Sequence, residues 1–153
     1  MNPAEDRYFE DYVVGSTHEF GAIPVTEEEV IDFAQRFDPQ SFHVDPEKAK
    51  KSIFGGIIAS GWHTCAIAMR LFVDHYLSRV ANLASPGVDE IRWVRPVRPG
   101  DELSIRVTVL DARQSRSKPE RGIVTSLTEV VNQRGEVVMA MKGLSIMLRR
   151  GQG

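Results

Sequence analysis

The stretch that decides the fold is FGGIIASGWHTCAIAMRLFVDHYLSRV, residues 54–80, in which glycines precede a long apolar segment. From Trp62 onward the apolar side chains recur at helical spacing and would cover most of the circumference of a helix. A helix that is apolar nearly all round must be largely surrounded by other structure. About twenty residues at about 1.5 Å each would make it roughly 30 Å long, the diameter of a small domain. We therefore expect one long, buried, central helix, with Cys65 as a small buried apolar residue in it.

Strands are predicted both before and after this helix in the sequence. One strand face is formed by four aliphatic residues at alternate positions, Leu103, Ile105, Val107 and Val109. Further strands are predicted at 16–25, 122–131 and 136–148, and the last two are joined by a hairpin turn at 132–135, NQRG. The polar run 113–121 is typical of an exposed connection. The predicted fold class is α+β, with an antiparallel sheet curled around the helix.

Two shorter helices are predicted upstream of the central one. Thr26 and Glu29 have the spacing of a capping box, and the helix that they begin should end at Phe37, because the next residue precedes a proline. Asp45 is followed by a proline at the first helical position, so it predicts a second helix that runs to Ser52.

The short segment between these helices, DPQSFH at 38–43, carries an acid and an imidazole five positions apart. That spacing suits neither one face of a helix nor one face of a strand. An irregular loop held by a helix at each end could still direct both side chains to one point. Asp-Pro is also an ordinary turn signal, and an isolated histidine is more often packed or exposed than catalytic. From these residues alone, the catalytic and the structural interpretation of Asp38 and His43 both stay open.

Composition narrows the class of protein. The 153 residues fit one domain, 1–153, and 19 basic against 21 acidic residues give no electrostatic reason to expect nucleic acid or an anionic membrane as a partner. No apolar run approaches the length needed to span a bilayer. One cysteine cannot form a disulfide within the chain, which favours a reducing, cytoplasmic location. The histidines lack the HxxxH spacing of a zinc site, so we expect no metal.

Three motifs resemble those of the MaoC-like dehydratases and (R)-specific enoyl-CoA hydratases. DPQSFH at 38–43 is similar to their signature D-x-N-P-x-H, with Gln40 and Ser41 in place of the usual asparagine and proline. FGGIIASGWHT at 54–64 and RPVRPGDEL at 95–103 resemble the start of the family's central helix and the segment that enters a sheet strand. The resemblance covers most of the chain and implies the hot-dog fold, an antiparallel sheet wrapped around a long central helix.

The resemblance also implies an activity and a site. The expected reaction is the reversible addition of water to a trans-2-enoyl thioester of coenzyme A or acyl carrier protein, with no cofactor beyond the coenzyme A of the substrate. Asp38 and His43 would be the acid–base pair, and the Gly61 N–H would stabilise negative charge on the thioester oxygen. A pKa of Asp38 raised by burial would tune the base. The residues expected to bind the substrate are Gly56, Ala59, Ser60 and His63.

Other interpretations stay open. A hot-dog thioesterase would carry its carboxylate on the central helix, where Asp74 lies too far along to be attractive. A non-catalytic acyl-thioester-binding protein, similar to nodulation protein N, would fit the departures at Gln40 and Ser41. Met69 stands where some of these hydratases carry a small polar residue, with packing in the core as the alternative. Three arginines could bind the phosphates of coenzyme A or simply be solvated: Arg92, Arg95 and Arg98. Pairing of exposed sheet edges predicts a homodimer.

Overall fold

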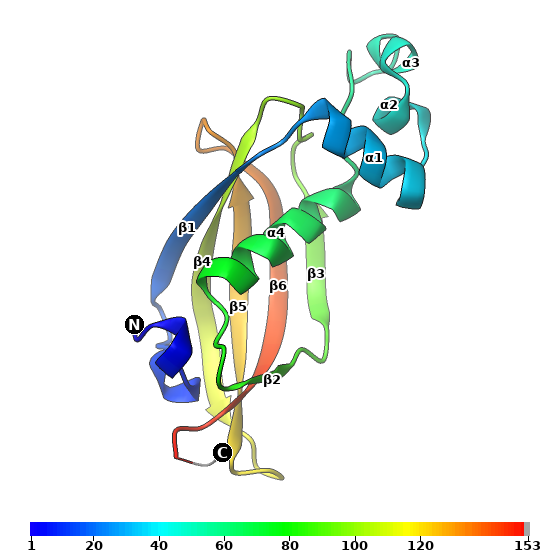
Figure 1. Ribbon diagram of the computed structural model, residues 1–153. Coiled ribbons are helices and arrows are strands. Elements are labelled where there is room, and N and C mark those ends of the chain that lie inside the picture. The colour runs from blue at the N-terminus through cyan, green and yellow to red at the C-terminus, as the bar shows by residue number, and fades with distance from the viewer. Residues whose placement is uncertain (152–153) are drawn as a thin grey trace.

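The computed structural model describes residues 1–151. Within them, six strands form one antiparallel sheet, and α4 (Gly61–His75) lies along one face of it (Figure 1). The strands are β1 (Thr17–Pro24), β2 (Asn82–Ala84), β3 (Val88–Trp93), β4 (Glu102–Gln114), β5 (Arg121–Val131) and β6 (Val137–Leu148). Their order is β1-β4-β5-β6, and β6 pairs on its other side with β3 and, further along, with β2. The predicted α+β class and hot-dog fold are confirmed.

The alternating strand pattern is confirmed in β4. Its four aliphatic side chains are buried in the core that the sheet shares with α4: Leu103, Ile105, Val107 and Val109. The strand continues past them to Gln114, because 111–114 pair with 122–125 of β5 beyond a break in register. The exposed connection predicted at 113–121 is therefore shorter than expected. The predicted turn at 132–135 joins β5 to β6.

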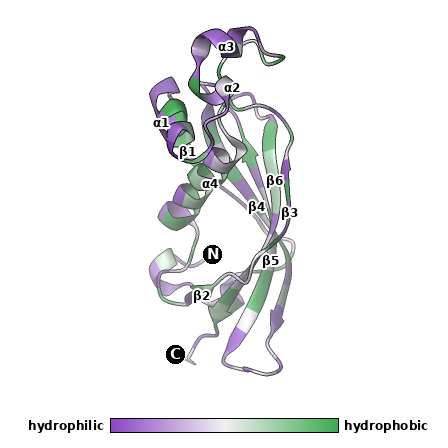
Figure 2. Ribbon diagram, turned by 90° about the vertical axis from the view of Figure 1, so that its right-hand side faces the viewer, coloured by the Kyte–Doolittle hydropathy of each residue, from purple (hydrophilic) through white to green (hydrophobic). Residues whose placement is uncertain are grey.

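The central helix is shorter than predicted and is covered on one side only. It has 15 residues, and its buried positions include Ile67, Ala68 and Leu71, which face the sheet. Figure 2 shows α4 along one face of the curved sheet. Its other side carries apolar side chains that are at least half exposed: Trp62 at 57%, Met69 at 55% and Val73 at 50%. The expectation of a helix that is largely surrounded by other structure is wrong, because one sheet covers only one side of it. Of the two interpretations of Met69, packing in the core is wrong.

The end of α4 is determined by the N-terminal segment. The Arg7 guanidinium donates a hydrogen bond to the carbonyl oxygen of Tyr76, the residue that follows the helix. The Ser78 hydroxyl donates to the Arg7 carbonyl and accepts from the Ala81 N–H at 2.8 Å, which holds the chain in a turn. Because Arg7 lies some seventy positions away in the sequence, helical periodicity alone could not predict this end.

Three short helices lie together at one end of the sheet, beside the start of α4 (Figure 1). They are α1 (Glu27–Phe37), α2 (Ser41–Val44) and α3 (Pro46–Lys50). Thr26 caps α1 by accepting the Glu29 N–H at 3.2 Å, which is one half of the predicted capping box. Asp45 caps α3 as predicted, although α3 ends at Lys50 rather than at Ser52. The helical turn α2 corrects the expectation that 38–43 is an irregular loop throughout.

Candidate active site

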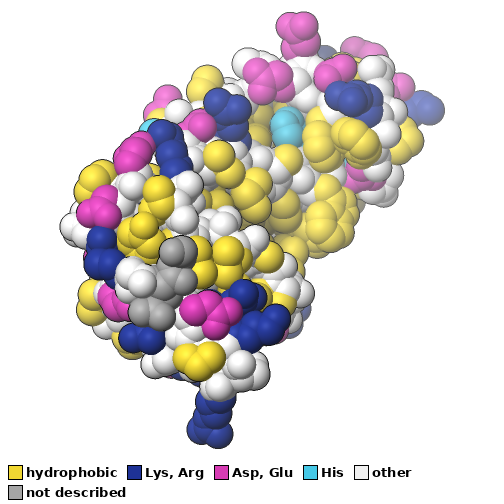
Figure 3. Space-filling view, turned by 60° about the horizontal axis from the view of Figure 1, so that its bottom comes forward, with side chains coloured by type: hydrophobic (Ala, Val, Ile, Leu, Met, Phe, Trp, Pro, Cys, Tyr) yellow, Lys and Arg dark blue, Asp and Glu magenta, His cyan; other side chains and the backbone are white. Residues whose placement is uncertain are grey.

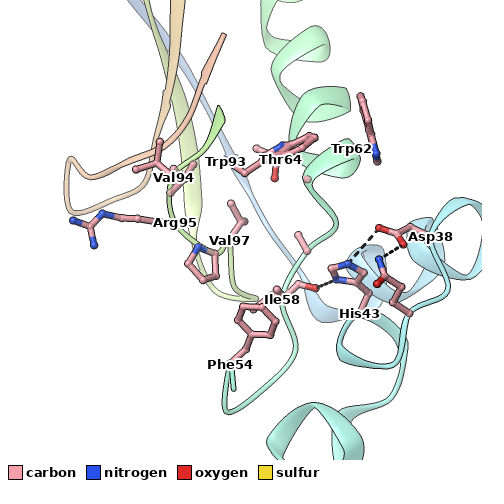
Figure 4. A pocket seen from close by; sticks show the side chains of 15 residues that line it. Asp38, His43, Phe54, Ile58, Trp62, Thr64, Trp93, Val94, Arg95 and Val97 are labelled. Carbon is pink, nitrogen blue, oxygen red and sulfur yellow. Dashed lines mark hydrogen bonds and ion pairs between the residues drawn. The ribbon is translucent and has the colours of Figure 1, made fainter. Parts of the chain in front are cut away.

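Asp38 and His43 meet at the junction of α1 and α2. Asp38 ends α1, where its N–H donates to the Ala34 carbonyl at 2.8 Å, and its non-helical backbone turns the chain away from the helix. The turn of α2 then carries His43 back, so that its Nε2 lies 3.3 Å from Asp38 Oδ2 (Figure 4). The His43 ring is buried, whereas the Asp38 side chain is 19% exposed. A helix end followed by one helical turn thus brings together two residues whose spacing fits no regular element.

The orientation of the His43 ring is fixed by a hydrogen bond on the side of the ring away from Asp38. Its Nδ1 lies 2.7 Å from the carbonyl oxygen of Ile58, and a carbonyl oxygen can only accept a hydrogen bond. Nδ1 therefore carries a proton, and Nε2 is the nitrogen that faces the carboxylate. The pair thus places a ring nitrogen and a carboxylate oxygen 3.3 Å apart, an arrangement that suits general acid–base chemistry.

Gln40 holds the other oxygen of the carboxylate. Its Nε2 donates to Asp38 Oδ1 at 2.7 Å. Burial raises the pKa of Asp38, but hydrogen bonding from Gln40 and Ser60 and the charge of His43 outweigh it and hold the pKa below its ordinary value. The expectation of a pKa raised by burial is wrong. Asp38 is a carboxylate at neutral pH, and Gln40, which the sequence marked only as a departure from the signature, is what holds it.

The pair opens into a cavity of about 400 Å³ between the start of α4 and the segment that follows β3. Phe54, Trp62, Thr64 and Trp93 are among the residues that line this cavity (Figure 4). The rings of Trp62 and Trp93 pack edge to face, with centroids 5.2 Å apart. Sequence reasoning did not single out Thr64 or Trp93. Thr64 could have been noticed as a hydroxyl within an apolar helix, but nothing in the sequence around Trp93 indicates that it would meet α4.

Gly61 is the first residue of α4 and lines the same cavity. Within residues 1–151 its N–H makes no hydrogen bond, as is usual for the first N–H groups of a helix. A Cβ at this position would overlap the indole ring of Trp93. The glycine therefore lets Trp93 pack against the start of the helix and leaves a free donor at the positive end of the helix dipole.

Of the four residues expected to bind substrate, the structure places one at the cavity and three away from its lining. Ala59 lines the cavity, whereas Gly56, Ser60 and His63 are not among its lining residues. The Ser60 side chain is buried and caps α4 by accepting the Trp62 N–H at 3.3 Å.

His63 points toward α1. Its ring stacks on Phe33 with centroids 4.7 Å apart, and its Nδ1 is buried without a hydrogen-bond partner in residues 1–151. Burial lowers the pKa of His63, against the opposing charge of Glu29. A position in the first turn of α4 was compatible with either side of the helix, so the sequence could not decide this placement.

The three arginines considered for binding the phosphates of coenzyme A have different surroundings. Arg95 lines the cavity and lies 3.6 Å from Glu136, whereas Arg92 forms an ion pair with Glu90 at 2.8 Å. The Arg98 guanidinium lies near Gly56. No group of three His, Cys, Asp or Glu side chains in residues 1–151 could hold a metal ion. Nor is any helix in that range long and apolar enough to cross a membrane.

Comparison with known proteins gives the family. The model of the MaoC like domain matches residues 12–132, which is most of the chain. The chain belongs to the MaoC-like dehydratase family. The crystal structure of a MaoC-like dehydratase from Rhodospirillum rubrum is 42% identical, with a TM-score of 0.88 over 94% of this chain and 98% of that one.

Two relatives of this MaoC-like protein differ in what is known of them. The uncharacterized protein YdeM of Bacillus subtilis is 36% identical over 92% of this chain and 98% of its own length. The 3-hydroxyacyl-thioester dehydratase Z of Mycobacterium tuberculosis is 31% identical over 71% of this chain and 73% of its own length. The family thus includes dehydratases of 3-hydroxyacyl thioesters.

Proposed function

We propose that this MaoC-like protein adds water reversibly to the double bond of a trans-2-enoyl thioester. The observation that carries the proposal is the Asp38–His43 pair, 3.3 Å apart, at the wall of a cavity that Gly61, the first residue of α4, also lines. Such a reaction needs a base for the water, a proton for C2 and a donor for the thioester oxygen. The relative from Mycobacterium tuberculosis is named for the reverse reaction, the dehydration of a 3-hydroxyacyl thioester.

The acid–base pair supplies the first two needs. Asp38, a carboxylate at neutral pH, would accept a proton from a water that contacts both it and His43 from the cavity side. The water oxygen forms a bond to C3, the C2–C3 double bond becomes single, and the electron pair moves onto the thioester oxygen. The electron pair then returns from the oxygen to re-form the carbonyl, and C2 takes one proton from the pair, so that the elements of one water molecule are added. The hydrogen bond between His43 and the Ile58 carbonyl keeps the ring aligned through both steps.

The start of α4 supplies the third requirement, a hydrogen-bond donor for the thioester oxygen. Negative charge on the thioester oxygen would meet the Gly61 N–H and the positive end of the helix dipole. Trp93 covers this point from the β3 side, so water competes less for the donor. The acyl carrier would be coenzyme A or acyl carrier protein, with Arg95 at the cavity as a candidate for contact with its phosphates.

The active form would be a homodimer. β3 is an edge strand with mostly exposed residues, and unpaired strand edges are a liability in a monomer. Hydrophobic side chains gather in a band across the face shown in Figure 3. The large exposed apolar side chains of the chain include Trp62, Met69 and Val73 on α4 and Val88 and Trp93 on β3. Pairing through β3 and α4 would bury apolar surface beside the cavity.

A non-catalytic acyl-thioester-binding protein is the second candidate. The observation in its favour is the Gln40–Asp38 hydrogen bond, which occupies one carboxylate oxygen that a base would otherwise offer to water. A thioesterase has less support, because Asp74 is not among the residues that line the cavity and is paired with Arg70 at 2.9 Å.

One labelling experiment separates these candidates. The protein is incubated with trans-2-butenoyl-CoA in water enriched in heavy oxygen, and the products are identified by mass spectrometry. A hydratase places the label on C3 of an intact 3-hydroxyacyl-CoA. A thioesterase places it in a free carboxylate and releases coenzyme A, and a binding protein leaves the substrate unlabelled. Absence of label at C3 across short and long enoyl-CoA substrates would contradict the proposal.

A further inference from the structure

A second cavity lies further along α4. Its volume is about 370 Å³, and it lies between the C-terminal half of the helix and the strands β5 and β6. Most of its lining is apolar and includes Met69, Phe72, Val73, Val88, Met141 and Met147. The two hydroxyl-bearing residues Ser126 and Thr128 of β5 also line it.

The two cavities follow one another along the same helix and strands. Along α4, Gly61 and Thr64 line the first cavity, and Met69 and Phe72 line the second. The residues of β6 and β3 line the two cavities in the same order as the residues of α4. Along β6, Val138 lines the first cavity and Met141 the second, and on β3, which pairs antiparallel with β6, Trp93 lines the first and Val88 the second.

Cys65 and Met139 separate the cavities. Each stands between lining residues of the first cavity and lining residues of the second, on α4 and on β6 respectively, and neither lines a cavity itself. Cys65 Sγ lies 3.5 Å from Met139 Sδ, and Met139 is fully buried. The contact therefore joins helix and strand at a position between the two cavities.

The position of the Cys65–Met139 contact sets the length of acyl chain that fits between Gly61 and the contact. With the thioester oxygen at the Gly61 N–H, Cys65 lies four residues along the helix axis, about 6 Å at about 1.5 Å per residue. A fully extended chain advances roughly 1.2 Å per bond, since a residue of three bonds spans about 3.5 Å. Counted from the carbonyl carbon C1, about five bonds therefore reach the contact, which places C6 there.

We propose that the Cys65–Met139 contact is the specificity determinant of this protein and limits the acyl group to about six carbons. This inference rests on the proposed function, because it takes the thioester to lie at Gly61. The substrate class is then a short-chain enoyl thioester. The second cavity is apolar space that a longer chain would enter only when the contact is opened.

The test removes the contact by shortening the Met139 side chain and compares this variant with a matched substitution further along β6. The variants are Met139→Ala and, as the control, Met147→Ala, a buried methionine of β6 that lines the second cavity but not the contact. For each protein, kcat/KM is measured on trans-2-enoyl-CoA substrates of four to twelve carbons. The wild type should lose about tenfold or more between six and ten carbons, since one misfitting methylene is worth roughly tenfold or more.

Met139→Ala should raise kcat/KM for the ten-carbon substrate by about tenfold or more and leave the four-carbon value within about threefold. Met147→Ala should leave the chain-length preference of the wild type unchanged. A wild type that uses ten carbons as well as four, or a Met139→Ala protein with the preference of the wild type, would overturn the inference. Met139→Val is the milder variant to use if Met139→Ala does not fold by circular dichroism.

A binding measurement keeps this inference separate from the proposed function. The affinities of butanoyl-CoA and decanoyl-CoA are compared by calorimetry for the same three proteins. A preference for butanoyl-CoA that Met139→Ala reverses supports the chain-length limit even if no enoyl-CoA is hydrated, in which case the proposed reaction alone fails. Equal affinities of the wild type for both ligands would contradict the limit, whatever the assays of hydration show.

Discussion

His43 Nδ1 lies 2.7 Å from the carbonyl oxygen of Ile58, and this hydrogen bond ties the candidate acid–base pair to the segment that begins α4. The tie is reciprocal, because the Ile58 N–H donates to the carbonyl oxygen of Phe42, the residue before His43. Gly61 follows Ile58 by three residues. The proton-transfer pair and the free N–H at the helix start are therefore held at a fixed separation by backbone hydrogen bonds, as a reaction at two neighbouring carbons requires.

Gln40→Ala should move the pH dependence of activity. Gln40 donates to the charged form of Asp38, so its removal raises the pKa of Asp38 toward the ordinary value. The acid limb of kcat/KM should therefore lie at higher pH in the variant than in the wild type. The check is a pH–rate profile on trans-2-butenoyl-CoA, with Gln35→Ala on the exposed side of α1 as the control. An unmoved acid limb would mean that Asp38 is not the group that titrates.

Gly61→Ala should reduce both activity and stability. The new methyl group would overlap the Trp93 indole, so either the ring or the start of α4 must move. We expect a loss of about 1–3 kcal/mol in the free energy of unfolding, as for other overpacked sites. Trp93→Leu in the same chain should recover part of that loss, which a double-mutant cycle in urea measures. Purely additive losses would show that the two residues do not compete for space.

His63→Phe should stabilise the protein and weaken its response to acid. The substitution keeps an aromatic ring against Phe33 and removes a buried nitrogen that has no partner in the described chain. We expect a gain of about 1 kcal/mol at neutral pH.

The sign of the pH effect follows from the lowered pKa of His63. Below about pH 6.5 the unfolded chain takes up a proton that the folded chain resists, so wild-type stability falls with pH from that point. The decline should be smaller in His63→Phe. Urea unfolding at several pH values is the measurement, and Gln35→Ala, a change at an exposed residue of α1 that does not titrate, should keep the wild-type slope. Equal slopes in wild type and His63→Phe would contradict this account.

Val73→Arg should dissociate the proposed homodimer. Val73 is half exposed on α4, at the edge of the second cavity, so a charge there can stay in water in a monomer but would be buried without a partner in the proposed interface. Sedimentation velocity should show a wild-type dimer and a monomeric variant at the same concentration. Gln35→Arg, on the exposed side of α1, should remain dimeric. A wild type that is monomeric at high concentration would remove the proposed interface.

Much of the fold was predictable because it depends on local patterns. Alternation in 103–109, the Thr26 cap and the turn at 132–135 each rest on physics that acts within a few residues. The end of α4 was not predictable, since it depends on Arg7 from the far end of the chain. The exposed side of α4 was missed because its apolar side chains have the pattern of a buried helix although no second layer covers them.

The candidate site was predictable where a motif carries it. The signature named Asp38 and His43, and the structure brings their side chains together. It could not show that Gln40 would hold the carboxylate, that Trp93 would pack on Gly61, or that His63 would turn toward α1. Each of these depends on which side chains meet across the fold, and spacing along the chain carries no information on that.

The most direct test of the central claim is kcat/KM for the hydration of trans-2-butenoyl-CoA by Asp38→Asn and His43→Ala. Asp45→Asn is the matched control, because Asp45 lies in the same segment and caps α3, a task that asparagine performs about as well. The account predicts that each of the first two variants loses about a hundredfold or more while keeping the wild-type circular dichroism spectrum, and that Asp45→Asn stays within about threefold of the wild type. Wild-type activity in Asp38→Asn or His43→Ala would contradict it.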